Sequence, residues 1–81
     1  MKIAWSGPAL ADMASLDRAI ARRVNQSVER FAETGVGDVK RLQGIDPPEY
    51  RLRSGDYRVR FYSDGVTLTV LRVRNRREAY R

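Results

Sequence analysis

Two short segments in the second half of the chain alternate arginine with apolar or aromatic residues, and this alternation constrains the fold more than any other feature. The segments cover residues 50–53 and 57–62, and Ser54-Gly55-Asp56 between them has the composition of a tight turn. Because successive side chains of a strand point to opposite faces, the pattern predicts a β-hairpin with one apolar face and one arginine-rich face.

The two faces of this hairpin have different expected environments. The apolar face must pack against other elements, so we predict that helices cover it. Its expected core residues are Tyr50, Leu52, Tyr57, Val59 and Phe61, and the opposite face carries Arg51, Arg53, Arg58 and Arg60. Like charges on neighbouring strands repel, so folding alone gives no reason for such a face. The alternative is that single arginines pair with carboxylates, and the candidates are Glu49, Asp56, Asp64 and Glu78.

The first half of the chain predicts a short strand over residues 2–5 and then two helices. Ser6-Gly7-Pro8 combines a helix-capping residue with a proline near a helix start, which predicts that the first helix begins there. Its expected core-facing residues are Leu10, Met13 and Ala14. The second helix follows the cap Asp17 and ends at Thr34-Gly35. Its apolar stripe is Ile20, Val24, Val28 and Phe31.

The remaining segments complete an α+β domain. Residues 39–42 form a weak strand, Pro47-Pro48 excludes a helix, and residues 66–73 form a long strand after the turn Ser63-Asp64-Gly65. The tail over residues 74–81 is too polar for core. We therefore predict one domain over residues 1–81, with a short N-terminal strand and two helices packed on one face of a mostly antiparallel sheet of about four to five strands.

Composition excludes several kinds of chemistry and indicates a polyanionic partner. The chain has no cysteine and no histidine, so we expect no disulfide, no metal and no cofactor. Its net charge is +6. Residues 1–39 hold five cations and five anions, whereas residues 40–81 hold eleven cations and five anions. Because the excess is confined to the second half, RNA or DNA is the expected partner.

No part of the sequence predicts a membrane segment. No run approaches the roughly 20 apolar residues that a spanning helix needs. The apolar stretch at residues 1–5 is too short for the core of a signal peptide. We therefore expect a cytoplasmic protein.

Three segments together resemble the RelE/ParE toxin superfamily, and its RelE branch most closely. They are Leu42-Gln43-Gly44, a hairpin of the form Y-R-L-R-x-G-D-Y-R beginning at Tyr50, and a C-terminal R-R-E-x-Y beginning at Arg76. The order of elements and the length agree over essentially the whole chain. The resemblance implies a RelE-like toxin of a type II toxin–antitoxin pair, an mRNA interferase that cuts mRNA in the ribosomal A site without metal.

Carried over position by position, the resemblance implies a set of site residues. The expected catalytic residues are Arg51, Arg58, Arg76 and Tyr80, and the expected RNA-binding residues are Arg53, Arg60, Arg74, Arg77 and Arg81. In such a reaction the RNA's own 2′-hydroxyl attacks the adjacent phosphorus, and Arg58 and Arg76 would stabilise charge on the phosphoryl oxygens. Tyr80 would orient or deprotonate the 2′-hydroxyl or stack on a base, because a phenol is a better base than a guanidinium.

Two other functions fit the same sequence. One is a ParE-like protein that poisons DNA gyrase without cutting RNA, and the other is a passive RNA-binding module or an inactive relative of the toxins. For the toxin, the expected partners are the ribosome, mRNA and a cognate antitoxin. An acidic or amphipathic antitoxin segment that folds on binding would neutralise the cationic face.

Overall fold

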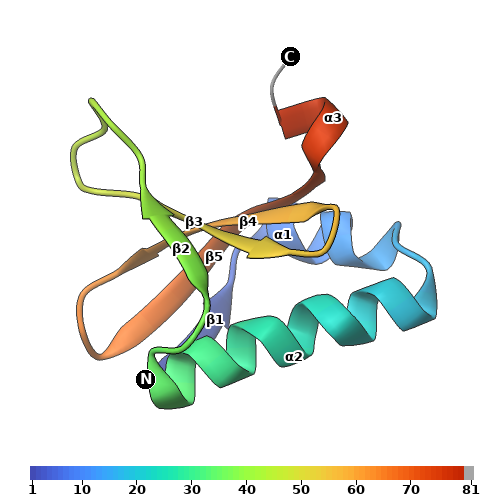
Figure 1. Ribbon diagram of the computed structural model, residues 1–81, viewed down its shortest axis with the longest axis horizontal. Helices are drawn as coiled ribbons and strands as arrows, with labels where there is room; N and C mark the ends of the chain where they lie inside the picture. The colour runs from blue at the N-terminus through green and yellow to red at the C-terminus, as the bar shows by residue number, and fades with distance from the viewer. Residues whose placement is uncertain (80–81) are drawn as a thin grey trace.

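The computed structural model, which describes residues 1–79, consists of a five-stranded sheet packed against helices (Figure 1). The strands are β1 (Lys2–Trp5), β2 (Asp38–Arg41), β3 (Tyr50–Ser54), β4 (Tyr57–Ser63) and β5 (Thr67–Asn75). The helices are α1 (Gly7–Ala14), α2 (Arg18–Thr34) and α3 (Arg76–Ala79). The sheet order is β1-β5-β4-β3-β2, with β1 and β5 parallel and the other pairs antiparallel. This confirms the predicted α+β class.

The two long helices begin at the predicted caps. The Ser6 hydroxyl accepts a hydrogen bond from the Ala9 amide at 3.1 Å, and an Asp17 carboxylate oxygen accepts one from the Ala19 amide at 3.2 Å. Helix α2 ends at Gly35, whose φ of 73° is left-handed and whose amide donates to the Phe31 carbonyl.

In the described part of the chain, no helix is long and apolar enough to cross a membrane.

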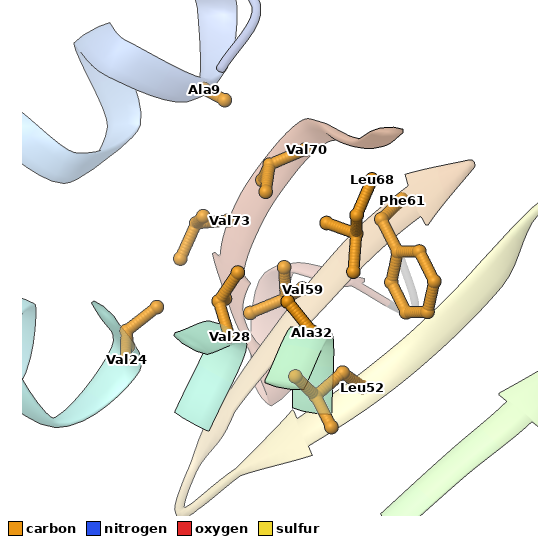
Figure 2. Packing of buried hydrophobic residues seen from close by; sticks show 10 residues of the cluster. All are labelled: Ala9, Val24, Val28, Ala32, Leu52, Val59, Phe61, Leu68, Val70 and Val73. Carbon is orange, nitrogen blue, oxygen red and sulfur yellow. The ribbon is translucent and has the colours of Figure 1, made fainter. Parts of the chain in front are cut away.

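The core lies between α2 and the middle strands, as Figure 2 shows. Its buried residues are Ala9, Val24, Val28, Ala32, Leu52, Val59, Phe61, Leu68, Val70 and Val73. The Phe61 ring contacts the Phe31 and Tyr50 rings, with centroid separations of 5.4 and 5.5 Å. The predicted apolar face of the hairpin is therefore the core face, although Tyr50 and Tyr57 at its margin are only partly buried.

The predicted core face of α1 was wrong in part. Leu10 is 56 % exposed and Ala14 is exposed, whereas Ala9 is fully buried and Met13 packs against the core. Ala9 and Met13 are four residues apart and so share a helix face. A small residue at position 9 lets the helix approach β5 closely, which a leucine there would prevent.

Strand β5 contains an irregularity that no local pattern predicted. Arg60 pairs with Arg72 and Phe61 pairs with Val70, so Leu71 is an extra residue between the two pairs. Strict alternation from Val70 would turn Arg72 toward the core. The extra residue shifts the alternation by one, so that Val73 is buried and Arg72 is on the opposite face.

Helix α1 covers the part of β5 that β1 leaves unpaired. The pairing of β1 with β5 ends at Trp5 and Val70. Beyond that point the Ser6 hydroxyl donates to the Leu71 carbonyl at 2.9 Å, and an Asp12 carboxylate oxygen accepts from the Val73 amide at 2.9 Å. These side chains satisfy backbone groups at the bulge that would otherwise lack a partner.

The C-terminal segment, which was predicted only to be too polar for core, contains regular structure. Strand β5 continues two residues beyond the predicted end at Val73, because Arg74 and Asn75 pair with Arg58 and Tyr57. Helix α3 follows directly, and its first amide, on Arg76, donates to the Asp56 carbonyl at 2.7 Å. This hydrogen bond holds the start of α3 beside the turn between β3 and β4.

The first testable prediction concerns the core. Replacing Val28 with alanine should lower the free energy of unfolding by about 2 kcal/mol, because it removes buried methyl groups and leaves a cavity between α2 and the sheet. Val66 is 66 % exposed, so Val66→Ala serves as the matched control and should change stability by less than about 0.5 kcal/mol. Urea unfolding followed by circular dichroism measures both, and equal losses would contradict the described core.

Candidate functional site

A groove of about 450 Å³ lies on the sheet face opposite α2. Its lining residues are Leu42, Ile45, Arg51, Arg58, Arg60, Arg72, Arg74 and Glu78. The arginines come from three neighbouring strands, β3, β4 and β5, and the two apolar residues come from the segment between β2 and β3. We call this set the arginine groove.

The sheet register places charged residues directly opposite one another on this face. One row runs from Lys40 through Arg51 and Arg60 to Arg72, and the next runs from Asp38 through Arg53 and Arg58 to Arg74. Cations opposed in register repel and lower stability. The surrounding structure must therefore offset part of this charge.

Arg58 is held in place by the hairpin that carries it. Its side chain is only 7 % exposed, and its Nη1 donates to the Gly55 carbonyl at 3.0 Å and to the Tyr57 carbonyl at 3.1 Å. Carbonyls of the turn thus fix the guanidinium without neutralising its charge. A fixed, largely desolvated cation interacts strongly with an anion and needs little reorganisation to do so.

Two other arginines of the groove form ion pairs with carboxylates. Arg60 Nη2 lies 2.6 Å from a Glu49 carboxylate oxygen, and Arg72 Nε lies 2.8 Å from an Asp12 carboxylate oxygen. The sequence had indicated Glu49 as a candidate partner, and the structure confirms that pairing for Arg60. It had not indicated Asp12.

The Asp12 carboxylate accepts three hydrogen bonds. Arg72 donates from Nε at 2.8 Å and from Nη2 at 3.1 Å, and the Val73 amide donates at 2.9 Å. The hydrogen bonds from Arg72, and to a smaller extent the one from Val73, lower the pKa of Asp12 although burial opposes them. The same pairing raises the pKa of Arg72, so both groups keep their charge across the physiological range.

The charges of the groove do not cancel. Of the residues that the structure describes, five arginines line the groove and three carboxylates, Glu78, Asp12 and Glu49, lie in or beside it, so positive charge is in excess. Among the described residues, neither Arg58 nor Arg74 forms a salt bridge with a carboxylate. Arginine side chains in such an arrangement are suited to an anion with the size and charge of a phosphate.

The structure brings some of the expected site residues together and separates others. Arg51, Arg58, Arg60 and Arg74 line the arginine groove. Arg76 and Arg77 line a neighbouring hollow of about 550 Å³ with Asp56, Tyr57, Asn75 and Glu78. Arg53 borders a third, smaller hollow beside α2. Tyr80 and Arg81 lie outside the described residues. Because Glu78 lines both the groove and the neighbouring hollow, the two sites adjoin.

Comparison with protein families identifies the chain. Residues 3–80 match the family of the ParE toxin of the type II toxin–antitoxin system parDE. The chain belongs to this toxin family. No curated protein matches the toxin. The resemblance to the RelE/ParE superfamily seen in the sequence is thus confirmed over nearly the whole length of the chain.

Solved structures show the same fold at low sequence identity. The toxin is similar to the RelB–RelE antitoxin–toxin complex from Methanococcus jannaschii, with a TM-score of 0.77 and 22 % identity over 95 % of this chain and 94 % of the other. For the archaeal RelE–RelB complex from Pyrococcus horikoshii the values are 0.76 and 24 % over 93 % of each chain. For the YoeB dimer from Staphylococcus aureus they are 0.72 and 16 %, covering 89 % and 92 %.

Sequence reasoning missed three residues of the toxin's groove. Arg72 is a cation like the predicted site residues, but it lines the groove only because Leu71 is an extra residue in β5. The sequence of residues 66–73 does not indicate that extra residue. Leu42 was predicted only as the end of a weak strand and as part of the resemblance, and Ile45 follows in the loop before Pro47-Pro48, so neither was expected at the site. The signal that would have found Arg72 is the paired spacing of Arg72 and Arg74, which mirrors that of Arg58 and Arg60.

The second prediction concerns Asp12 in the toxin. Asp12→Asn should lower the free energy of unfolding by about 1 to 2 kcal/mol at pH 7, because it removes a charge that accepts three hydrogen bonds, while the partly exposed Arg72 keeps the loss modest. The pKa of Asp12 is lowered in the folded state. The contribution of Asp12 to the free energy of unfolding is therefore fully present above the ordinary carboxyl pKa of about 4. It is lost as the pH falls through the lowered pKa of Asp12 in the folded state.

The measurement is urea unfolding of wild type and Asp12→Asn at a series of pH values from neutral to strongly acidic. The difference in stability should be constant near neutral pH and shrink below about pH 4. Asp17→Asn is the matched control, because it changes net charge equally and asparagine caps a helix as well as aspartate does. A stability difference for Asp12→Asn that does not change with pH would contradict the ion pair.

Proposed function

We propose that this toxin is a metal-independent endoribonuclease that cuts mRNA in the ribosomal A site. The observation that supports the proposal is the placement of Arg58, fixed by carbonyls of its own hairpin, in a groove lined by five arginines with an excess of positive charge. Such a groove holds a phosphate of an RNA chain and has donors ready for the charge that develops on it during cleavage.

The reaction that suits this site uses the substrate's own nucleophile. The RNA 2′-oxygen attacks the adjacent phosphorus, a new P–O bond forms, and the bond to the 5′-oxygen of the next nucleotide breaks. The products are a 2′,3′-cyclic phosphate and a 5′-hydroxyl. Arg58 stabilises the extra negative charge on the phosphoryl oxygens, and Arg51 and Arg74 hold the chain in the groove.

The remaining proton-transfer steps involve residues of the C-terminal segment. Tyr80 receives or orients the 2′-proton or stacks on a base, since the chain has no histidine. Arg76 lies at the adjoining hollow, where it assists the leaving 5′-oxygen or binds the next phosphate, and the 5′-oxygen takes a proton from water to become the 5′-hydroxyl. Arg60, Arg77, Arg53 and Arg81 bind the RNA backbone at greater distance from the reacting bond.

Dependence on the ribosome follows from the weakness of the base. A site without histidine gains little from proton abstraction, so the alignment of the RNA must contribute more. Correct positioning of reacting groups is worth roughly 7 to 11 kcal/mol of a barrier. The A site supplies mRNA in a fixed conformation, and both the ribosome and the mRNA place the toxin in the cytoplasm.

A cognate antitoxin is the second partner. Two of the similar structures are complexes of RelE with RelB. The arginine groove carries a net positive charge, and an acidic, amphipathic segment that folds on the toxin would neutralise it.

A second candidate function is a gyrase poison that binds its target without cutting RNA. The match to the ParE toxin family favours the gyrase poison. The similar solved structures, in contrast, are RelE and YoeB toxins. Fold and charge fit both functions equally well.

The third prediction separates these functions by mapping mRNA 5′ ends after expression of the toxin. Wild type should produce discrete 5′ ends at A-site positions of translated mRNA. Arg58→Lys should cut at least about 100-fold more slowly, because lysine keeps the charge and loses the planar fork that reaches carbonyl and phosphate together. Arg22→Lys, on the exposed side of α2, is the matched control and should cut like wild type.

Each other outcome of this experiment contradicts the proposal in a specific way. Absence of cuts together with inhibition of purified gyrase assigns the toxin to the second function. Ribosome binding by the wild type without any cut assigns it to passive RNA binding. Efficient cutting of bare mRNA by the purified toxin contradicts ribosome dependence.

The fourth prediction concerns Tyr80. Tyr80→Phe removes only the hydroxyl and should slow cutting about 100-fold or more if the phenol acts on the 2′-proton. If the ring only stacks, Tyr80→Phe cuts like wild type and Tyr80→Ala is slow. The single-turnover rate on ribosome-bound mRNA measures both. Full activity of Tyr80→Ala would remove Tyr80 from the site.

A further inference from the structure

We propose that Asp12, on α1, is a positioning residue of the arginine groove. It binds no RNA itself. Through its paired hydrogen bonds to Arg72 it holds one arginine at the groove wall and withdraws that charge from phosphate binding, so that the phosphate is directed to Arg58 and Arg74. The catalytic part of this inference rests on the proposed function, and the structural part does not.

The contact joins two parts of the chain that are far apart in sequence. Asp12 and Arg72 are 60 positions apart, and Asp12 and Val73 are 61 apart. One carboxylate oxygen accepts from both Arg72 Nε and the Val73 amide, and the other accepts from Arg72 Nη2. The side chain of Arg72 and the backbone beside it are thus fixed by the same group.

The location of this contact gives it a role in the groove. It lies next to Leu71, the extra residue that turns Arg72 onto the groove face. Backbone at a bulge has an incomplete ladder and needs other partners to keep its conformation. Asp12 supplies one for the Val73 amide, and the same carboxylate then determines where the guanidinium lies.

The pairing also divides the groove arginines of β4 and β5 into two classes. Arg60 and Arg72 are opposite one another in the register, and each is bound to a carboxylate. Arg58 and Arg74 are also opposite one another, and neither forms a salt bridge with any described carboxylate, although the charge of Asp12 also acts on Arg74. An incoming phosphate must compete with Asp12 for Arg72, whereas nothing of that kind opposes it at Arg58. The phosphate is therefore guided to one row of the sheet.

Releasing Arg72 should have opposite effects on binding and on cutting. In Asp12→Asn the guanidinium gains freedom and a full uncompensated charge, so bare RNA binds more tightly. The same freedom lets a phosphate bind at more than one place in the groove, so fewer complexes hold it against Arg58. A residue that only stabilised the fold would weaken both properties together.

The fifth prediction tests this split with a short single-stranded oligouridylate as the probe. The affinity of Asp12→Asn for it should rise, and the slope of log affinity against log salt should steepen by about 0.7, the value for one additional phosphate contact on a single strand. Asp17→Asn has the same net charge, but Asp17 neither lines the groove nor pairs with one of its arginines, so this variant should keep the wild-type slope. Equal slopes for the two variants would overturn the proposal.

The cutting rate on ribosome-bound mRNA supplies the second arm. At saturating toxin, Asp12→Asn should cut about 10-fold more slowly than wild type and Asp17→Asn. If Asp12 acts through Arg72, the double variant Asp12→Asn/Arg72→Gln should cut no more slowly than Arg72→Gln alone. Additive losses would show that Asp12 acts through the fold instead.

The fixed pairing of Asp12 with Arg72 can be tested on the wild-type toxin without an RNA-cleavage assay. In the ¹⁵N spectrum of wild-type toxin, the Arg72 Nε–H signal should be resolved at neutral pH and should merge with those of exposed arginines as acid protonates Asp12. An Arg72 signal that is averaged at neutral pH would overturn the fixed pairing. If wild type does not cut RNA, the proposed function fails, while this spectrum and the salt slope still decide the role of Asp12.

Discussion

The two-residue period of the hairpin strands is the constraint on which the rest of the molecule depends. Leu52, Val59 and Phe61 beneath α2 supply half of the buried apolar residues of the sheet. The residues between them are arginines, so the same burial forces a row of guanidiniums onto the opposite face. Stability on one face and charge on the other are therefore inseparable consequences of one pattern.

A sheet face with opposed cations is unfavourable unless other elements offset the charge. The carboxylates that do so come from outside the alternating strands, Glu49 from the segment before β3 and Asp12 from α1. In the other row, neither Arg58 nor Arg74 forms a salt bridge with a carboxylate among the described residues. Because compensation is selective, the groove keeps its excess charge where Arg58 is fixed.

The candidate site was predictable to the extent that it lies on regular strands. Arg51, Arg58 and Arg60 follow from the hairpin alternation, and the structure places them in one groove. Arg72 could not be assigned in this way, because one extra residue in β5 reverses the face of every residue after it. The separation of Arg76 and Arg77 into an adjoining hollow depends on α3, a helix too short to leave a periodic signal.

The sequence by itself determined the helix caps, the five strands to within a few residues, the core face of the hairpin and the membership of the toxin superfamily. All of these rest on local spacing or on motifs that are contiguous in the chain. The tertiary structure alone decided which face of α1 is buried, where β5 is irregular and which carboxylates pair with the groove arginines. Those features join residues as far as 65 positions apart, and no local pattern encodes a contact of that length.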